Sequence, residues 1–326
     1  MKVNAVFEGG GVKAIGLAGA VSEAQKRGVT FDKTAGTSSG SIVAALLAAG
    51  YTGEEMKQII LSTPFTKFLK KGWLHQIRWI GPAVRLFVKK GLYAGEELEY
   101  WIYKLLLAKG IRTFADLPYN RLKIIASDIS LGKLLVLPDD ISRYGIDPHK
   151  LTVAKAIRMS TSIPYFFDPV IIRKKYPRKK KEKFTDQLVY VVDGGLLSNF
   201  PLWLFDIHEL KPGEKSLPTL GFQLVGRGSN EPNRIVGPLS MFQALFSTMM
   251  DAHDERFIED HKSFRTIKIP TLGVHTTEFD LTKERSLELY DSGMKAAAKF
   301  FNKWSYEDYL AKCKKTDATA RALVRQ

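Results

Sequence analysis

The fold is most legible in residues 3–50, which read VNAVFEGGGVKAIGLAGAVSEAQKRGVTFDKTAGTSSGSIVAALLAAG. The apolar run Val3–Phe7 predicts a buried strand, and small and apolar residues recur at helical spacing from Val12 to Lys26. A short strand over residues 34–36 then leads through a tight turn into an alanine- and leucine-rich helix from Ser41 to Ala49, which ends at a glycine. The stretch therefore predicts strand, glycine turn and helix twice in succession.

The rest of the chain continues this alternation. Hydrophobic periodicity predicts strands over residues 122–127, 133–137, 166–172, 188–192 and 217–225. It predicts helices over residues 96–109, 152–159, 238–257 and 282–304. Alternation of this kind is typical of a mostly parallel sheet covered by helices. We therefore expect a three-layer α/β/α fold in a single domain over residues 1–326, with a C-terminal helical region from about residue 238 to 326.

The composition is that of an ordinary globular protein except for its charge. Among the 326 residues, 45% are hydrophobic and 25% are charged, but the formal net charge is +15. Residues 64–90 carry seven Lys and Arg with aromatic residues between them and no acidic residue. Residues 173–183 carry eight basic residues and one glutamate, and we expect them to form a solvated loop. This excess favours anionic surfaces such as phospholipid or nucleic acid.

The cysteine content and the lengths of the apolar runs indicate in which cellular compartment the protein is expected. Cys313 is the only cysteine and lies in a polar stretch, which excludes disulfides within the chain and suits a reducing compartment. The apolar run at the start of the chain is too short for a signal peptide. No uninterrupted run of about eighteen apolar residues occurs, so we expect no membrane-spanning helix. These features predict a cytoplasmic protein, and the positive charge predicts peripheral association with membranes.

Residues 36–40, Gly-Thr-Ser-Ser-Gly, match the G-x-S-x-G pattern between a predicted strand and a predicted helix. Ligands bind beyond the carboxyl ends of the strands in such sheets. A serine on this sharp turn is strained, and a side chain at Gly36 or Gly40 would collide with the turn. The hydroxyl of Ser38 would project at the start of a helix, where the helix dipole favours negative charge. Ser38 is therefore a candidate nucleophile; the alternative is a serine that only caps the helix.

Three consecutive glycines, Gly9, Gly10 and Gly11, follow the first predicted strand. Their backbone N–H groups can point into one concavity and bind the oxyanion of an acyl-transfer reaction, where each donor contributes roughly 3–4 kcal/mol. The alternatives are a dinucleotide-binding turn and a simple tight turn. A dinucleotide-binding turn fits poorly, because the G-x-G-x-x-G frame from Gly9 ends on Ala14, and the P-loop lysine pattern is also absent.

A serine nucleophile needs a base, and histidine is the usual one. The chain has six histidines, none of which follows a predicted strand at a glycine-bounded turn. Asp193 does, because it ends the strand over residues 188–192 and precedes two glycines. The chain can turn there and bring the carboxylate to the edge of the sheet where Ser38 lies. Asp193 is therefore the predicted base; the alternative is a structural Asp-Gly turn.

The glycine loop, the G-x-S-x-G turn and the Asp-Gly-Gly turn, in this order, resemble the patatin family of lipid acyl hydrolases. The resemblance covers roughly residues 3–205. It includes the serine-rich stretch AIRMSTSIP at residues 156–164, FDPV at residues 167–170, and Asn199 and Pro201 after the Asp-Gly-Gly turn. Two residues depart from the family pattern: Ala14 replaces a usual glycine, which could alter the glycine loop, and Met159 replaces a usual small residue.

The resemblance implies a Ser–Asp dyad without histidine. Ser38 would be the nucleophile, Asp193 the general base, and the N–H groups of Gly10 and Gly11 the oxyanion donors. No metal and no organic cofactor is implied. The implied activity is hydrolysis of carboxylic esters of lipids, with an acyltransferase as the alternative on the same dyad.

The expected substrate is a phospholipid or another lipid ester. Basic and interfacial residues that could face an anionic membrane are Lys70, Lys71, Trp73, Trp79, Lys179, Lys180 and Lys181. The opposing interpretation is that these charges are a solvated face and the aromatic residues belong to the core. A nucleotide- or nucleic-acid-binding protein would use the same charge, but no recognition motif accompanies it, and we expect no nucleic acid partner. The sequence does not indicate an oligomeric state.

Overall fold

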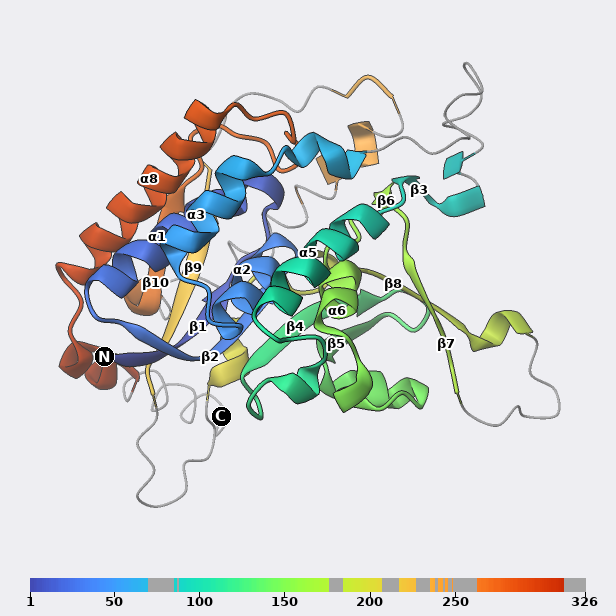
Figure 1. The fold of residues 1–326 in the computed structure, drawn as a ribbon, viewed down its shortest axis with the longest axis horizontal. Coiled ribbons are helices and arrows are strands. Elements are labelled where there is room, and N and C mark those ends of the chain that lie inside the picture. Colours follow the sequence, from blue (N-terminus) through green and yellow to red (C-terminus); the bar gives the residue numbers. More distant parts are fainter. Residues whose placement is uncertain are drawn as a thin grey trace, which may run out of the picture.

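The computed structural model describes residues 1–69, 85–86, 88–175, 184–206, 217–226, 235–237, 240–242, 244–245, 248 and 263–313. The strands of the central sheet are β1 (Lys2–Phe7), β2 (Thr30–Thr37), β4 (Leu122–Asp128), β5 (Lys133–Leu137), β7 (Val170–Arg173), β8 (Leu188–Asp193), β9 (Thr219–Val225) and β10 (Thr266–Pro270). They follow the order β10-β9-β1-β2-β4-β8-β7, and β5 also pairs with β4 (Figure 1).

Most of this sheet is parallel. The five strands from β10 to β4 pair in parallel, whereas β5 and β8 run antiparallel to β4, and β7 runs antiparallel to β8. The carboxyl ends of β1 and β2 are level, because Phe7 pairs with Gly36. The residues that follow these two strands therefore meet at one edge of the sheet.

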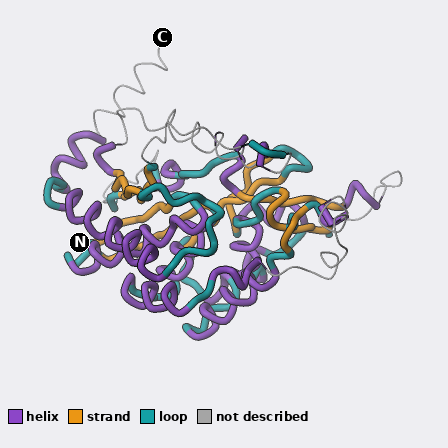
Figure 2. Tube along the Cα trace, turned by 90° about the horizontal axis from the view of Figure 1, so that it is seen from above, coloured by secondary structure: helices purple, strands orange, loops and turns teal. Residues whose placement is uncertain are grey.

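Helices flank the sheet. The α-helices are α1 (Ile15–Lys26), α2 (Ser39–Ala48), α3 (Gly53–Ser62), α5 (Glu96–Ala108), α6 (Val153–Ser160) and α8 (Lys283–Phe301), and Figure 2 shows most of the helical turns gathered on one side. On the other face, Val6 of β1 and Ala35 of β2 pack against Leu202 of the 3₁₀ helix η9 (Leu202–Phe205). A central, mostly parallel sheet flanked by helices confirms the predicted fold class.

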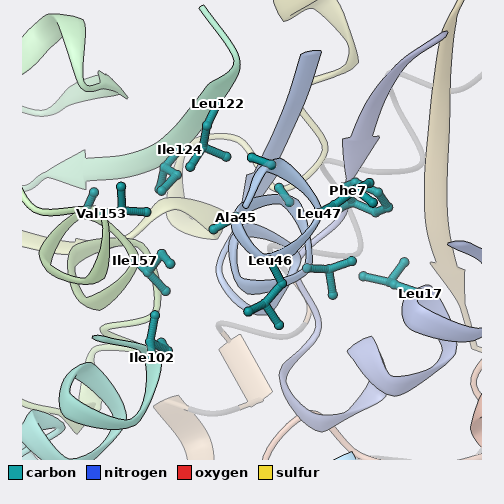
Figure 3. Packing of buried hydrophobic residues seen from close by; sticks show 14 of the residues in the cluster. Phe7, Leu17, Ala45, Leu46, Leu47, Ile102, Leu122, Ile124, Val153 and Ile157 are labelled. Carbon is teal, nitrogen blue, oxygen red and sulfur yellow. The ribbon is translucent and has the colours of Figure 1, made fainter. Parts of the chain in front are cut away.

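Helix α2 lies at the centre of the main core (Figure 3). Nine of its ten residues are buried, because helices and strands surround it on all sides. Its Ala45, Leu46 and Leu47 pack among apolar side chains of β1, β4, α5 and α6, including Phe7 and Ile157. This burial fixes the first turn of α2, which directly follows Ser38.

Close backbone contact joins α1 to α8. A Cβ atom on Gly19 would lie 1.9 Å from the carbonyl oxygen of Tyr290, and one on Gly293 would lie 1.9 Å from that of Gly16. Only glycine permits such an approach, since no real Cβ contact is this short. The two helices therefore pack backbone to backbone beside β9 and the edge strand β10.

Several elements differ from the sequence prediction. The helix predicted over residues 12–26 begins as the 3₁₀ helix η1 (Gly11–Ala14) and continues as α1. The strand predicted over residues 166–172 is two strands, β6 (Tyr165–Phe167) and β7, separated by Asp168 and Pro169; proline has no N–H for a strand ladder. Strand β6 pairs with β3 (Gly91–Tyr93) in a separate small sheet.

The sequence analysis did not predict helix α3, strand β10 or the short strand β3. Helix α3 begins at a capping box, in which the Thr52 side chain accepts the Glu55 N–H and the Glu55 side chain accepts the Thr52 N–H. Strand β10 interrupts the region from about residue 238 that was predicted to be helical; with five residues it is short, and Lys268 and Pro270 on it are exposed. Most of the helix predicted over residues 238–257 and most of the basic loop over residues 173–183 lie outside the described residues; within 238–257, residues 240–242, 244–245 and 248 are described and are helical.

Candidate active site

Ser38 occupies a sharp turn between β2 and α2. Its φ of 51° and ψ of −129° are strained for a residue with a side chain. A Cβ atom on Gly36 would lie 2.4 Å from the Gly40 carbonyl oxygen, and one on Gly40 would lie 2.4 Å from the Glu8 carbonyl oxygen. The two glycines of the G-x-S-x-G pattern are thus required by close backbone contacts, and the turn packs directly onto the end of β1.

Hydrogen bonds from other elements hold the turn in place. The N–H of Ser38 donates to the hydroxyl of Ser160 at the end of α6, over 2.8 Å, and that hydroxyl donates to the carbonyl oxygen of Ile125 in β4. The Ser41 hydroxyl donates to the Ser38 carbonyl oxygen. The serine-rich stretch of residues 156–164 therefore supports the candidate nucleophile, a role that its sequence pattern alone did not reveal.

The carboxylate of Asp193 lies against the hydroxyl of Ser38. Ser38 Oγ donates to Asp193 Oδ2 over 2.6 Å, and the other carboxylate oxygen accepts the Gly195 N–H over 2.8 Å. The Asp193 N–H donates to the carbonyl oxygen of Ser162. Asp193 is fully buried, and this burial raises its pKa to about 7, against the two hydrogen bonds, which lower it. Near neutral pH this carboxylate can both accept and release a proton.

Asp193 reaches Ser38 by an unexpected route. We expected a strand that ends at the same sheet edge as β2, but β8 runs antiparallel to β4 and enters from the opposite end. Asp193 pairs with Ala126 of β4, and the preceding Ile125 pairs with Thr37 of β2. The last residue of β8 is therefore level with the end of β2, one strand away.

The loop Gly9–Gly11 lies directly over Ser38. A Cβ atom on Gly9 would be 3.0 Å from the Cβ of Ser38. The N–H of Gly9 donates to the carbonyl oxygen of Asn199, and the N–H of Gly10 donates to the hydroxyl of Ser39 over 3.0 Å. The N–H of Gly11, the first residue of η1, has no acceptor among the described residues. Gly11 therefore presents the backbone donor that is open to a ligand.

Ser38 lines an apolar cavity that is partly open to solvent. Gly11, Ser38, Ser39 and Thr161 line it together with apolar side chains only. Those side chains come from η1, α1, α2, α3, the 3₁₀ helix η2 (Phe65–Leu69), α5 and the segments near Phe167 and Phe279. This apolar lining favours an apolar ligand, because burial of each methylene group contributes about 0.8 kcal/mol.

The structure brings together Ser38, Asp193 and the glycine loop, but not every predicted residue can be placed. Lys70, Lys71, Trp73, Trp79, Lys179, Lys180 and Lys181 lie outside the described residues. Of the six histidines, His149 and His275 are described; both are exposed, and neither bonds to Ser38 or Asp193. The described residues contain no cluster of side chains that could hold a metal ion, and no helix among them is long and apolar enough to cross a membrane.

The sequence model of the patatin-like phospholipases matches residues 5–206, a range that includes the glycine loop, Ser38 and Asp193. The chain belongs to the patatin-like phospholipase family. Uncharacterized protein YqhO of Bacillus subtilis (strain 168) is 40% identical over 311 residues, which cover 94% of this chain and 100% of YqhO. Uncharacterized protein R571 of Acanthamoeba polyphaga mimivirus is 25% identical over 209 residues, 62% of this chain and 61% of R571.

Among solved structures, VipD from Legionella pneumophila shares the fold of this chain. The TM-score is 0.52 and the sequence identity 16%, over 92% of this chain and 66% of the VipD chain. At this identity the likeness concerns the fold alone. Membership of the patatin-like phospholipase family supports the function of a lipid hydrolase.

The buried Asp193 predicts a pH-dependent effect of Asp193→Asn on stability. Below about pH 4 the carboxyl is protonated in both the folded and the unfolded chain, because an unfolded aspartate has a pKa near 3.9. Between there and about pH 7 only the unfolded chain ionises, so the wild type loses stability as pH rises. We expect the variant to gain on the wild type across this window and to keep that gain above it.

Urea unfolding at about pH 4.5 and pH 8 measures this difference. The exposed Asp280→Asn is the control, since its carboxylate remains in water; its effect should be equal at the two pH values. An equal effect of Asp193→Asn at both pH values would show that Asp193 is not protonated in the fold.

Proposed function

We propose that this protein is a lipid acyl hydrolase that cleaves carboxylic esters through an acyl-enzyme on Ser38, with Asp193 as the general base. The observation that carries the proposal is the 2.6 Å hydrogen bond from the Ser38 hydroxyl to the fully buried Asp193 carboxylate. Ser38 also lines an apolar cavity, and this adds the substrate class to the proposal. A hydroxyl bonded to a base is the arrangement that nucleophilic catalysis requires.

The reaction would proceed in two halves. Ser38 Oγ attacks the ester carbonyl while its proton passes to Asp193 Oδ2, and the carbonyl oxygen becomes an oxyanion at the N–H of Gly11. The intermediate collapses, the alcohol leaves with the proton from Asp193, and the acyl group stays on Ser38. Water then attacks the acyl-enzyme, gives its proton to Asp193, and releases the fatty acid and Ser38 Oγ–H.

The pKa of the base suits this cycle. An aspartate with an ordinary pKa near 4 is a weak acceptor for a hydroxyl proton, whereas a pKa of about 7 brings Asp193 closer to the working pH. The strained turn at Ser38 keeps the hydroxyl exposed to the cavity rather than folded back onto α2. The sequence predicted both Gly10 and Gly11 as oxyanion donors; we propose Gly11 as the donor, because the Gly10 N–H already donates to the Ser39 hydroxyl.

The family and the positive charge lead us to propose a phospholipid as substrate, reached by peripheral association with an anionic membrane. The formal net charge is +15, and each Lys or Arg near an anionic surface contributes about 1 kcal/mol to binding. The basic segments 64–90 and 173–183 would supply much of this attraction.

Loss of either member of the pair should abolish hydrolysis. We expect Ser38→Ala and Asp193→Asn to lower kcat/KM on a lipid ester by about 10⁴-fold or more without unfolding the chain.

In the wild type, kcat/KM should rise about tenfold per pH unit below pH 7 and level off above it, because Asp193 must be ionised. A fluorophosphonate probe, followed by peptide mapping, should label Ser38. Labelling at another residue, or near-normal turnover of Asp193→Asn, would refute the pair.

The cavity should set the preferred chain length. Ile59 of α3 lines it, and Ile59→Trp should fill part of the space that a long acyl chain occupies. We expect kcat/KM for a p-nitrophenyl decanoate to fall about tenfold or more, while that for the butyrate changes less than about twofold. Ile129→Trp, at an exposed position outside the cavity, is the control. An unchanged decanoate-to-butyrate ratio would remove the cavity from the substrate site.

Membrane association is measured by sedimentation with lipid vesicles. The protein should pellet with vesicles that contain anionic lipid and remain in solution with neutral ones, and the difference should shrink at high salt because the attraction is electrostatic. Equal binding to both kinds of vesicle would contradict this part of the proposal and leave the ester chemistry untouched.

A further inference from the structure

Asn199 binds the glycine loop at two points. Its side-chain Nδ2 donates to the carbonyl oxygen of Gly9 over 3.2 Å, and its backbone carbonyl oxygen accepts the N–H of the same Gly9 over 3.3 Å. Asn199 is 3% exposed and is 190 residues from Gly9 in the sequence. A Cβ atom on Gly9 would lie 2.5 Å from Asn199 Oδ1, so that the two residues are in direct contact.

The segment that carries Asn199 also contacts the other two parts of the site. It follows Asp193 through the 3₁₀ helix η8 (Gly194–Leu196), whose turn closes when the Ser198 N–H donates to the Gly194 carbonyl oxygen. The Ser198 carbonyl oxygen accepts the hydroxyl of Thr37, the residue before Ser38, over 2.9 Å. One short segment thus connects the candidate base, the nucleophile turn and the glycine loop.

The contact with Asn199 fixes the direction of a peptide plane. The carbonyl of Gly9 and the N–H of Gly10 belong to one planar peptide group, so they cannot turn independently. Asn199 holds the carbonyl end, and the hydroxyl of Ser39 holds the N–H end. The next peptide group joins Gly10 to Gly11 and contains the Gly10 carbonyl and the Gly11 N–H. Its orientation is further fixed because the Gly10 carbonyl oxygen accepts the N–H of Lys13.

The Gly9–Gly10 peptide needs these contacts because, without them, it could rotate and change the direction of the next N–H. Glycine has no Cβ to restrict its dihedral angles, and three glycines in succession would otherwise sample many orientations. An oxyanion donor contributes only when its N–H is already aimed at the charge that develops in the transition state. The direction of the Gly11 N–H therefore depends on the Lys13 contact with the Gly10 carbonyl and, one peptide earlier, on the contacts that hold the Gly9–Gly10 peptide.

We infer that Asn199 is a positioning residue for ester hydrolysis: it fixes the Gly9–Gly10 peptide so that the Gly11 N–H points at the oxyanion on Ser38. The inference rests on the proposed function. Its energetic effect falls on the transition state, where the oxyanion exists, and not on binding of the substrate in the cavity, to which Asn199 does not contribute a wall.

Asn199→Ala removes the Nδ2 donor and keeps the backbone contact. We expect kcat for a p-nitrophenyl ester to fall about 10–100-fold while KM stays within about twofold of the wild type. The affinity for an alkyl trifluoromethyl ketone, which forms a tetrahedral adduct with a serine, should fall by the same factor as kcat/KM. Asn302→Ala is the matched control: this asparagine accepts a hydrogen bond from Arg27, far from Ser38 in the fold, and all three quantities should stay within about twofold.

A double-mutant cycle with Ser39→Ala separates positioning from general loss of structure. Asn199 and Ser39 hold opposite ends of one peptide, so the double variant should lose little more kcat than the worse single variant. If Asn199→Ala does not fold, Asn199→Ser, which retains a polar hydrogen at this position, takes its place in the cycle. Thermal unfolding monitors the fold of every variant.

The outcomes are distinct. A kcat within about twofold of the wild type, a rise in KM alone, additive losses in the cycle, or a fall in kcat without a matching loss of ketone affinity would each overturn the role of Asn199 while the proposed function stands. A wild type that neither hydrolyses the ester nor reacts with the fluorophosphonate at Ser38 would refute the proposed function, and the inference with it.

Discussion

The architecture of this protein depends on how closely backbone can approach backbone around Ser38. The turn that carries Ser38 lies against the carbonyl groups at the end of β1, at a distance that excludes a side chain on Gly40. Gly194, beside Asp193, would place a Cβ atom 2.3 Å from the carbonyl oxygen of Ile125. Because these positions carry no side chains, the ends of three strands bring the glycine loop, the candidate nucleophile and the candidate base close together. The strain at Ser38 persists because the surrounding structure determines it from several sides.

That closeness has an electrostatic consequence. A carboxylate packed this tightly is removed from water, and loss of hydration is the dominant cause of the raised pKa of Asp193. The same burial that makes the group a stronger base works against its ionisation in the fold. Only two hydrogen bonds, from Ser38 and from the Gly195 N–H, favour the ionised form. The candidate site is therefore a place where local stability and reactivity are opposed.

The sequence predicts the parts of this site that depend on local rules. Glycines two residues before and after a serine, between a strand and a helix, predict a sharp turn too tight for side chains at those positions. The close backbone contacts of Gly36 and Gly40 confirm this turn. Apolar runs located most strands and helices of the described residues. The family match adds the order of the motifs.

Contacts between residues far apart in the sequence could not be predicted. The antiparallel course of β8 was missed because an apolar strand has the same pattern in either direction. The hydrogen bond that Ser160 accepts from the Ser38 N–H and the one that Asn199 donates to the Gly9 carbonyl oxygen each link residues more than a hundred positions apart, and neither residue type is distinctive by itself. Strand β10 was missed because five residues with an exposed lysine and proline carry little periodic signal. A single sequence does not show which strands and which distant residues contact one another, because these contacts form only when the sheet is assembled.

The apolar cavity adds a different consequence. Its walls come mainly from α1, α2, α3, η2 and α5, whereas the proposed chemistry depends on strand ends and turns on the other side of Ser38. Substitutions on those helices can change the depth and width of the cavity without moving a hydrogen bond of Ser38 or Asp193. If the protein has the proposed function, such substitutions would change which acyl chains it accepts while the hydrogen bond between Ser38 and Asp193 stays the same. Because the cavity walls and the proposed catalytic residues lie on different elements, related proteins could carry out the same reaction on different substrates.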